Sequence, residues 1–179
     1  MSFIYLDWSS SSFLDLEQLL DLEKNLEKFH ALKLPQQLIH GDLHYDNVLT
    51  TSDKVSGLLD FEFCAFDWRA MELAICLSKY AGEKIAMIYF EDFVSGFAEH
   101  GKLTKTEIEA IPDLIVLRIL SNVVYFVGRA LANEDSIESL TTRADSYANR
   151  IRWIYSNKQA IIEMIKSKFA VKDAALMNA

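Results

Sequence analysis

The stretch "LIHGDLHYDNVL", residues 38–49, holds two histidines, two aspartates and one asparagine within twelve positions. Apolar pairs close it at both ends and predict short buried strands. Titratable side chains between two such strands indicate a loop built for chemistry. The alternative is ordinary turn chemistry, in which Asp, Asn and His side chains cap backbone groups.

The next residues predict a β-hairpin. Strands at 48–50 and 55–59 flank "TSDK", residues 51–54, whose composition is typical of a turn. With this turn, Thr50 faces Val55 across the ladder.

The same register places Asn47 opposite Leu58, with Asp60 two positions beyond Leu58 on the same side. Asn47 and Asp60 are then diagonal neighbours, roughly 7–8 Å apart at the backbone. A carboxamide and a carboxylate at that separation suit Mg²⁺, which prefers oxygen ligands. Asp42, five residues before Asn47, would present a proton acceptor to the same point.

Composition limits the possible partners. The chain has 179 residues, 51% of them hydrophobic, which fits one domain with a sizeable core. The formal net charge of -8 argues against nucleic acid or an anionic membrane and is compatible with a cationic substrate or a metal site. Cys64 and Cys76 form no CxxC motif and are interpreted as reduced thiols of a cytoplasmic protein.

Targeting signals are not expected. The N-terminus "MSFIYLDWSS" lacks the basic and apolar regions of a signal peptide. The most apolar region, 114–132, is interrupted by Arg118, Asn122 and Arg129, so no uncharged run reaches the ~20 residues of a membrane span.

Apolar periodicity outside the hairpin predicts helices. Ser12 with Asp15, and Thr104 with Glu107, resemble capping boxes. The expected class is α+β and mostly α, a helical bundle with one small β-hairpin. The expected helices are one with apolar residues at Leu19, Leu22, Leu26 and Phe29 that ends near Pro35, then 68–81, 84–100, 105–131 with a break at Pro112, and 136–168.

"HGDLHYDN" followed by "LLDFEF" resembles the aminoglycoside phosphotransferase, choline kinase and type II homoserine kinase family, which has a protein-kinase-like fold. The resemblance implies that Asp42 is the catalytic aspartate, that Asn47 and Asp60 hold Mg²⁺, and that ATP is the co-substrate. His40 and Glu62 are further candidates for cofactor contacts. The alternatives are a loop-bracing histidine and a solvated strand end.

"FDWRAMELA", residues 66–74, resembles the family segment D-P-x-x-x-D-L-A. Asp67 matches its first aspartate, while Trp68 replaces the proline and Glu72 the second aspartate. The resemblance covers about residues 15–165 and only the family's C-terminal lobe. The single domain 1–179 is therefore expected to be a C-lobe without the nucleotide clamp of an N-terminal lobe.

Two further patterns concern the acceptor and a rival chemistry. Arg118, Asn122, Tyr125 and Arg129 share one helix stripe, which would line an acceptor pocket or face solvent. Arginine there would suit a carboxylate-bearing acceptor. His40 and His44 are the basis of the rival enzyme class, a di-metal phosphoesterase, which normally needs more histidines.

The function expected from the resemblance is transfer of the γ-phosphoryl group of ATP to the hydroxyl of a small molecule, with homoserine the favoured acceptor. Aminoglycosides and choline or ethanolamine are alternative acceptors. An aromatic cage of Tyr147, Trp153 and Tyr155 would suit a quaternary amine, although helical core packing explains these residues as well. The alternative class is a non-catalytic binding domain whose uncovered cleft is buried by a partner chain or a second copy.

Overall fold

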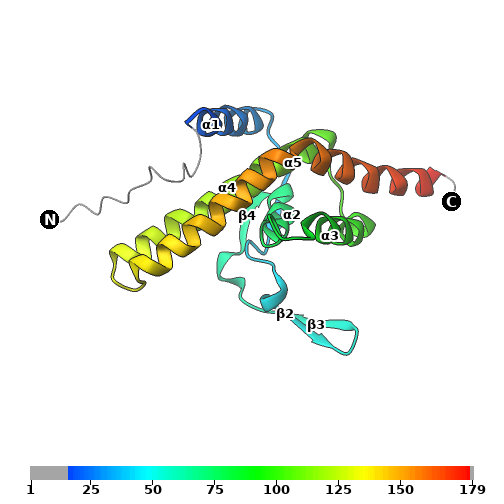
Figure 1. Ribbon diagram of the computed structural model, residues 1–179. Helices are drawn as coiled ribbons and strands as arrows, with labels where there is room; N and C mark the ends of the chain where they lie inside the picture. Colours follow the sequence, from blue (N-terminus) through cyan, green and yellow to red (C-terminus); the bar gives the residue numbers. More distant parts are fainter. Residues whose placement is uncertain (1–15, 178–179) are drawn as a thin grey trace.

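The structure is a computed structural model that describes the backbone of residues 16–177 and the side chains of residues 17–170. The expected capping box at Ser12 and Asp15 lies outside these residues. Five helices and two small β-ribbons make up the described part (Figure 1). The helices are α1 (Leu16–Ala31), α2 (Arg69–Ser78), α3 (Ala86–His100), α4 (Lys105–Leu131) and α5 (Ile137–Met177).

The two longest helices, α4 and α5, form an antiparallel pair (Figure 1). Helix α2 packs against α4, α3 packs against α5, and α1 contacts α4. Their apolar faces form one core, and each fully buried large side chain contributes roughly 1.5–3 kcal/mol. In α1 the expected apolar stripe is only partly buried, since Leu19 remains 39% exposed. The core includes Leu22, Phe29, Leu73, Leu77, Phe90, Ile111, Leu114, Ile115, Ile151, Ile154 and Ile161.

Helix α4 begins with the expected capping box. Thr104 Oγ1 accepts from the Glu107 backbone N–H at 3.2 Å, and Glu107 Oε2 accepts from the Thr104 N–H at 2.7 Å. The break expected at Pro112 is wrong, because α4 continues through it. Proline removes one helical hydrogen bond. Buried packing of α4 on either side of Pro112 maintains the helix.

Among residues 16–177, α4 has the length and composition that would suffice to cross a membrane, with 44% of its most apolar window buried in the fold. The apolar residues that raise its hydropathy include Ile111, Leu114 and Ile115. All three have no exposed surface and belong to the core. Packing within the bundle therefore accounts for the apolar character of this helix.

The β-structure consists of two antiparallel ribbons. β1 (Gln36–Ile39) pairs with β4 (Ala65–Trp68), and β2 (Val48–Thr51) pairs with β3 (Lys54–Leu58). The β2–β3 hairpin projects from the helical body (Figure 1). Strand β4 differs from expectation, because the sequence predicted only helices after residue 63.

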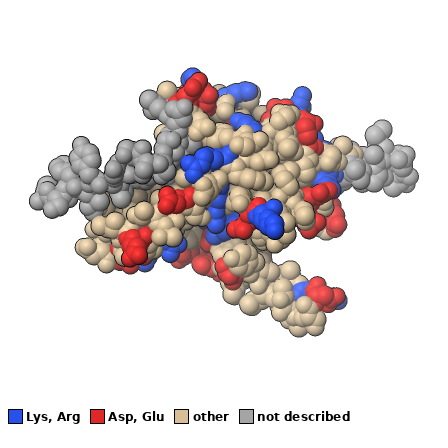
Figure 2. Space-filling model, viewed as in Figure 1, with Lys and Arg blue, Asp and Glu red and all other residues tan. Residues whose placement is uncertain are grey.

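The hairpin register is partly as expected. Thr50 faces Val55, but a bulge between Leu49 and Thr50 shifts the rest, so that Val48 and not Asn47 lies opposite Leu58. A bulge adds one residue to one strand and changes which side chains share a face. The predicted pairing of Asn47 with Leu58 is therefore wrong. Acidic and basic side chains are interspersed on the face shown in Figure 2, including on the projecting hairpin.

Candidate functional site

The loop after β1 turns sharply at Gly41 and places Asp42 within hydrogen-bonding distance of Arg118 on α4. Gly41 has φ of +79°, and a Cβ there would overlap the carbonyl oxygen of Phe63. Only glycine accommodates both the left-handed conformation and this close approach. Gly41 therefore fixes the path of the chain immediately before Asp42.

The carboxylate of Asp42 is held through both oxygens. Oδ1 accepts from Nη2 of Arg118 on α4 at 2.5 Å. Oδ2 lies 3.4 Å from Nδ2 of Asn47 and 3.4 Å from Nε2 of His44. Asp42 is 15% exposed at its side chain, so it is oriented and still reachable from solvent.

Asn47 ends a short 3₁₀ helix, η2 (Tyr45–Asn47), rather than lying on the strand. Its Nδ2 donates to the backbone oxygen of Asp42 at 2.9 Å, and the side chain is buried. Because Nδ2 is committed to Asp42, Oδ1 is the amide atom presented elsewhere, and an oxygen suits a hard cation.

Asp60 reaches the same region by a different route from the predicted ladder. The N–H of Leu59 donates to the backbone oxygen of Asn47 at 2.9 Å, which brings the following residue beside the loop. Asp60 itself has φ of 62°. A non-glycine residue in this region carries conformational strain, and such strain gathers at functional sites.

His40 links the two halves of the site. Its Nε2 lies 2.8 Å from the carbonyl oxygen of Leu59, and its Nδ1 accepts from the N–H of Asp42 at 3.3 Å. This arrangement requires the proton on Nε2. Both ring nitrogens are thus engaged within the protein, which matches the bracing alternative. The cofactor contact predicted for His40 has no support from its ring.

Glu72 on α2 is a site residue whose role the sequence reasoning missed. Its Oε2 accepts from the backbone N–H groups of His40 at 2.7 Å and Gly41 at 3.3 Å. The Glu72 carboxylate therefore holds the backbone immediately before Asp42. The signal was present, because Glu72 occupies the place of the second aspartate in the family segment.

A cleft of about 450 Å³ opens over Asp42. Three of the residues predicted to bind the substrate, Arg118, Asn122 and Tyr125, line it from α4. The solvent-facing alternative for this stripe is therefore wrong at Arg118, which is 16% exposed and bonded to Asp42. The lining comprises Asp42, Asp60, Glu62, Phe63, Lys79, Arg118, Ser121, Asn122, Tyr125, Phe126, Arg143 and Tyr147.

Two predicted substrate residues do not line this cleft. Arg129 is paired with Glu134 at 3.3 Å and Asp135 at 3.6 Å, at the turn between α4 and α5. Asp67 lies on β4, where its Oδ1 accepts from the N–H of Trp68 at 2.6 Å next to the start of α2. Arg129 thus has ion-pair partners of its own, and Asp67 accepts from the neighbouring backbone.

The cleft contains cations that the sequence did not reveal. Lys79 and Arg143 line it together with Arg118. Burial lowers the pKa of the Lys79 ammonium, the Asp42 carboxylate opposes this, and Arg118 lowers the pKa further. The cleft therefore presents basic side chains beside its carboxylates Asp42, Asp60 and Glu62.

The described residues favour a single cation site over a di-metal site. Among the described residues, no group of three or more His, Cys, Asp or Glu is arranged to hold a metal ion, so the di-metal phosphoesterase has no support. The Asn47 amide and the exposed Asp60 carboxylate fit a cation that takes its other ligands from phosphates and water.

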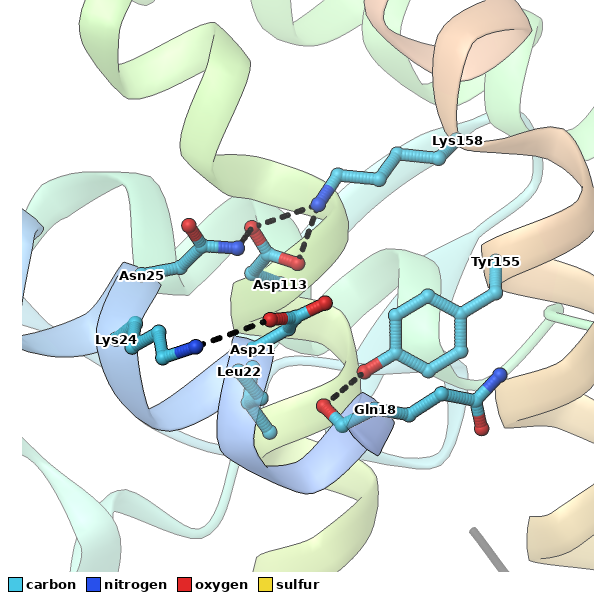
Figure 3. Close-up of a pocket in the computed structure, with 8 residues that line it drawn as sticks. All are labelled: Gln18, Asp21, Leu22, Lys24, Asn25, Asp113, Tyr155 and Lys158. Carbon is cyan, nitrogen blue, oxygen red and sulfur yellow. Dashed lines mark hydrogen bonds and ion pairs between the residues drawn. The ribbon is translucent and has the colours of Figure 1, made fainter. Parts of the chain in front are cut away.

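The three aromatic residues proposed as a cage lie in different surroundings. Tyr147 stacks with Phe126 at the cleft, with ring centroids 6.5 Å apart. Trp153 packs edge-on against Phe90 at 5.4 Å. Tyr155 lines a separate pocket beside α1 (Figure 3). They therefore do not enclose one ligand.

Comparison with known proteins gives a family match. The family model described as "Phosphotransferase enzyme family" matches residues 5–104, which include the loop, the hairpin and α2.

Curated relatives include several homoserine kinases. That of Sinorhizobium fredii is 32% identical over 127 residues, covering 65% of this chain and 39% of the relative. That of Beijerinckia indica is 38% identical over 92 residues, covering 50% of this chain and 29% of the relative. The chain thus spans well under half the length of these relatives.

Solved structures share the fold. A microcompartment-associated aminopropanol kinase aligns with a TM-score of 0.58 at 19% identity, covering 86% of this chain and 49% of that one. An amicoumacin kinase in complex with AMP-PNP and Ca²⁺ aligns with a TM-score of 0.56 at 16% identity, covering 84% of this chain and 49% of that one. The described fold therefore corresponds to about half of a kinase-like protein, as expected for a C-lobe.

Proposed function

The chain belongs to the phosphotransferase enzyme family, and we propose that it contributes the catalytic loop and acceptor cleft of an ATP-dependent small-molecule kinase. The observation that carries this proposal is the convergence of Asp42, Asn47 and Asp60. Asn47 bonds to Asp42 through its side chain and is linked to the Asp60 segment through the backbone. Asp42 and Asp60 line the same cleft.

Asp42 orients the acceptor hydroxyl and takes its proton. Its position at the cleft floor, fixed by Asn47 and by the turn at Gly41, suits this role. General base catalysis of this kind contributes about 10²–10⁴-fold to the rate.

Asp60, which lines the cleft, and Asn47, which bonds to Asp42 beside it, would hold Mg²⁺. When bound, the ion supplies charge neutralisation for the phosphates of ATP. Asp60 offers an exposed carboxylate, and Glu62, also exposed on the cleft, stands close enough in sequence to assist.

We favour homoserine as the acceptor. The relatives named as homoserine kinases support it, as do the cleft cations Lys79, Arg118 and Arg143, which suit an acceptor that carries a carboxylate. Aminoglycosides and choline or ethanolamine remain alternatives, supported by the net charge of -8. ATP as co-substrate and two cysteines that form no disulfide suit a cytoplasmic location.

Isothermal titration of Mg²⁺·ATP into the chain tests the nucleotide part of the proposal. Micromolar binding supports it, and no heat up to millimolar nucleotide contradicts it. Asp60→Ala should abolish the Mg²⁺ dependence of binding. Asp42→Ala should leave nucleotide binding intact and stop turnover, and the reverse behaviour of these two variants would refute the assigned roles.

A second candidate function is a non-catalytic domain that self-associates. Leu38 on β1 and Phe66 on β4 are cross-strand neighbours that are 68% and 70% exposed. Exposed apolar pairs of this kind favour burial by protein. Sedimentation of the wild type and of the double variant Leu38→Ser/Phe66→Ser tests it. A concentration-dependent dimer that the substitutions dissociate supports this candidate, and a monomer throughout contradicts it.

A further inference from the structure

Two arginine–carboxylate pairs in this fold differ in geometry. Arg69 binds Glu107 through one edge of its guanidinium, with Nε to Oε1 at 2.7 Å and Nη2 to Oε2 at 2.8 Å. This is the bidentate arrangement, the stronger and more specific one. Arg118 uses the same kind of edge only in part.

At Arg118, Nη2 donates to Oδ1 of Asp42, and no second bond joins the pair. The Nε of Arg118 is buried and has no hydrogen-bond partner within residues 17–170. A buried donor without a partner costs about 1–3 kcal/mol. The Nε–Nη2 edge therefore has an unused donor, which a ligand that accepts two hydrogen bonds can reach when the side chains around it move.

The same pair occupies the atom that the reaction needs. Asp42 directs Oδ2 toward Asn47 and His44, and Oδ1 toward Arg118. In this arrangement Arg118 takes part of the accepting capacity of Oδ1, although Asp42 lines the cleft. Loss of the Arg118 contact would leave Oδ1 fully available to an acceptor hydroxyl, while Asn47 still holds the adjacent backbone.

Building on the proposed function, we propose that Arg118 is a positioning residue that exchanges Asp42 for the carboxylate of a small hydroxy amino acid. The acceptor carboxylate takes both Nε and Nη2 of Arg118. Oδ1 of Asp42 then turns to the acceptor hydroxyl. Acceptor binding thereby releases the base, and acceptors that lack a carboxylate leave Asp42 paired.

The rest of the cleft favours this exchange. Lys79 and Arg143 line it and add positive charge near the incoming carboxylate. Arg143 is held with its guanidinium 4.2 Å from the centre of the Phe126 ring and its Nε 3.4 Å from Ser139 Oγ.

A matched ligand pair tests the carboxylate. L-homoserine and 3-aminopropan-1-ol share the amine, the hydroxyl and their spacing, and only the first has a carboxylate. By calorimetry, L-homoserine should bind the chain about tenfold more tightly than the amino alcohol, because a bidentate charge-assisted pair is gained. In Arg118→Met this preference should disappear. In Arg152→Met, an exposed site on α5 bonded to Asn149, it should persist.

The exchange itself makes a second, opposite prediction for Asp42. Asp42→Asn removes the anion that competes for Arg118, so L-homoserine should bind about tenfold more tightly than to the wild type, by reciprocal coupling. The gain should be lost in the double variant Asp42→Asn/Arg118→Met. Unchanged or weaker binding to Asp42→Asn would show that Arg118 is a fixed brace and overturn the exchange.

The nucleotide titration separates the two proposals. Mg²⁺·ATP binding with equal affinity for the two acceptor ligands, or with no binding of L-homoserine, would retain the kinase assignment and overturn the exchange. Carboxylate preference with the Asp42→Asn gain, but without nucleotide binding, would support the exchange and contradict the kinase assignment for this chain.

Discussion

Replacing Arg69 by Met should destabilise the fold severely, because it leaves a buried carboxylate without its cation. Glu107 has no exposed side-chain surface, and both its oxygens bond to Arg69. Removing one partner of a buried pair typically costs about 3–5 kcal/mol. We expect a loss of that size at pH 7.

The loss of stability in Arg69→Met should depend on pH, because Glu107 is titratable. Burial raises the pKa of Glu107, but hydrogen bonds from Arg69 and Thr104 outweigh it and hold the pKa below its usual value. In the wild type this group therefore contributes stability above the unfolded pKa of about 4.3, and the contribution is lost as pH falls through the lower folded pKa.

In Arg69→Met, burial dominates and the folded pKa of Glu107 rises. The folded state then binds the proton more tightly than the unfolded state, so the variant loses stability as pH increases above about 4.3. The deficit relative to wild type should be larger at pH 7 than at pH 4.

Urea unfolding followed by circular dichroism at both pH values measures these deficits. Lys105→Met on the same helix is the matched control, since Lys105 is 79% exposed and 4.0 Å from Glu109. It should cost less than about 0.5 kcal/mol. A loss below about 1 kcal/mol for Arg69→Met at pH 7, or equal deficits at both pH values, would refute this reasoning.

Three further predictions concern the loop, the α1 pocket and a buried thiol. Gly41→Ala should lower the unfolding free energy by about 1–3 kcal/mol in urea titrations because of its positive φ, and wild-type stability would contradict this. Lys158→Met should lower the unfolding free energy by about 2–3 kcal/mol, since Asp113 (3% exposed) would keep only its hydrogen bond from Asn25 at 3.2 Å (Figure 3). The double variant Lys158→Met/Asp113→Asn should recover part of this loss, and additive losses would count against the pairing. Burial raises the pKa of the Cys76 thiol, so Ellman's reagent should modify it slowly in the folded chain and quickly in urea, and equal rates would be unexpected.

Local patterns predicted the helices and part of the hairpin. The capping box at Thr104 and Glu107 and the pairing of Thr50 with Val55 depend on residues a few positions apart, and both are confirmed. The break at Pro112 was wrong because local propensity ignores packing by α2 and α5, which retains the helix. Short-range chemistry thus determines where elements begin, and tertiary packing determines whether they continue.

The missed features depend on contacts between distant residues. Strand β4 pairs with β1, and Leu38 lies opposite Phe66. The bulge next to Leu49 changed the register that the sequence suggested for Asn47. The segment that carries Asp60 is still joined to the loop, through a backbone hydrogen bond between Leu59 and Asn47. The predicted ladder geometry is therefore wrong, and the roles of Asp42, Asn47 and Asp60 stay predictions.

Helix α4 connects the stability of the fold to the chemistry of the cleft. Its first turn is fixed to α2 through Glu107 and Arg69, and roughly three turns later the same helix presents Arg118 to Asp42. Helix α2 in turn supplies Glu72, which caps the backbone on which Asp42 lies. Loosening the Arg69 pair should therefore shift Arg118 and the Asp42 loop relative to each other. It follows that Arg69→Met, where it remains folded, should weaken acceptor discrimination although Arg69 does not line the cleft.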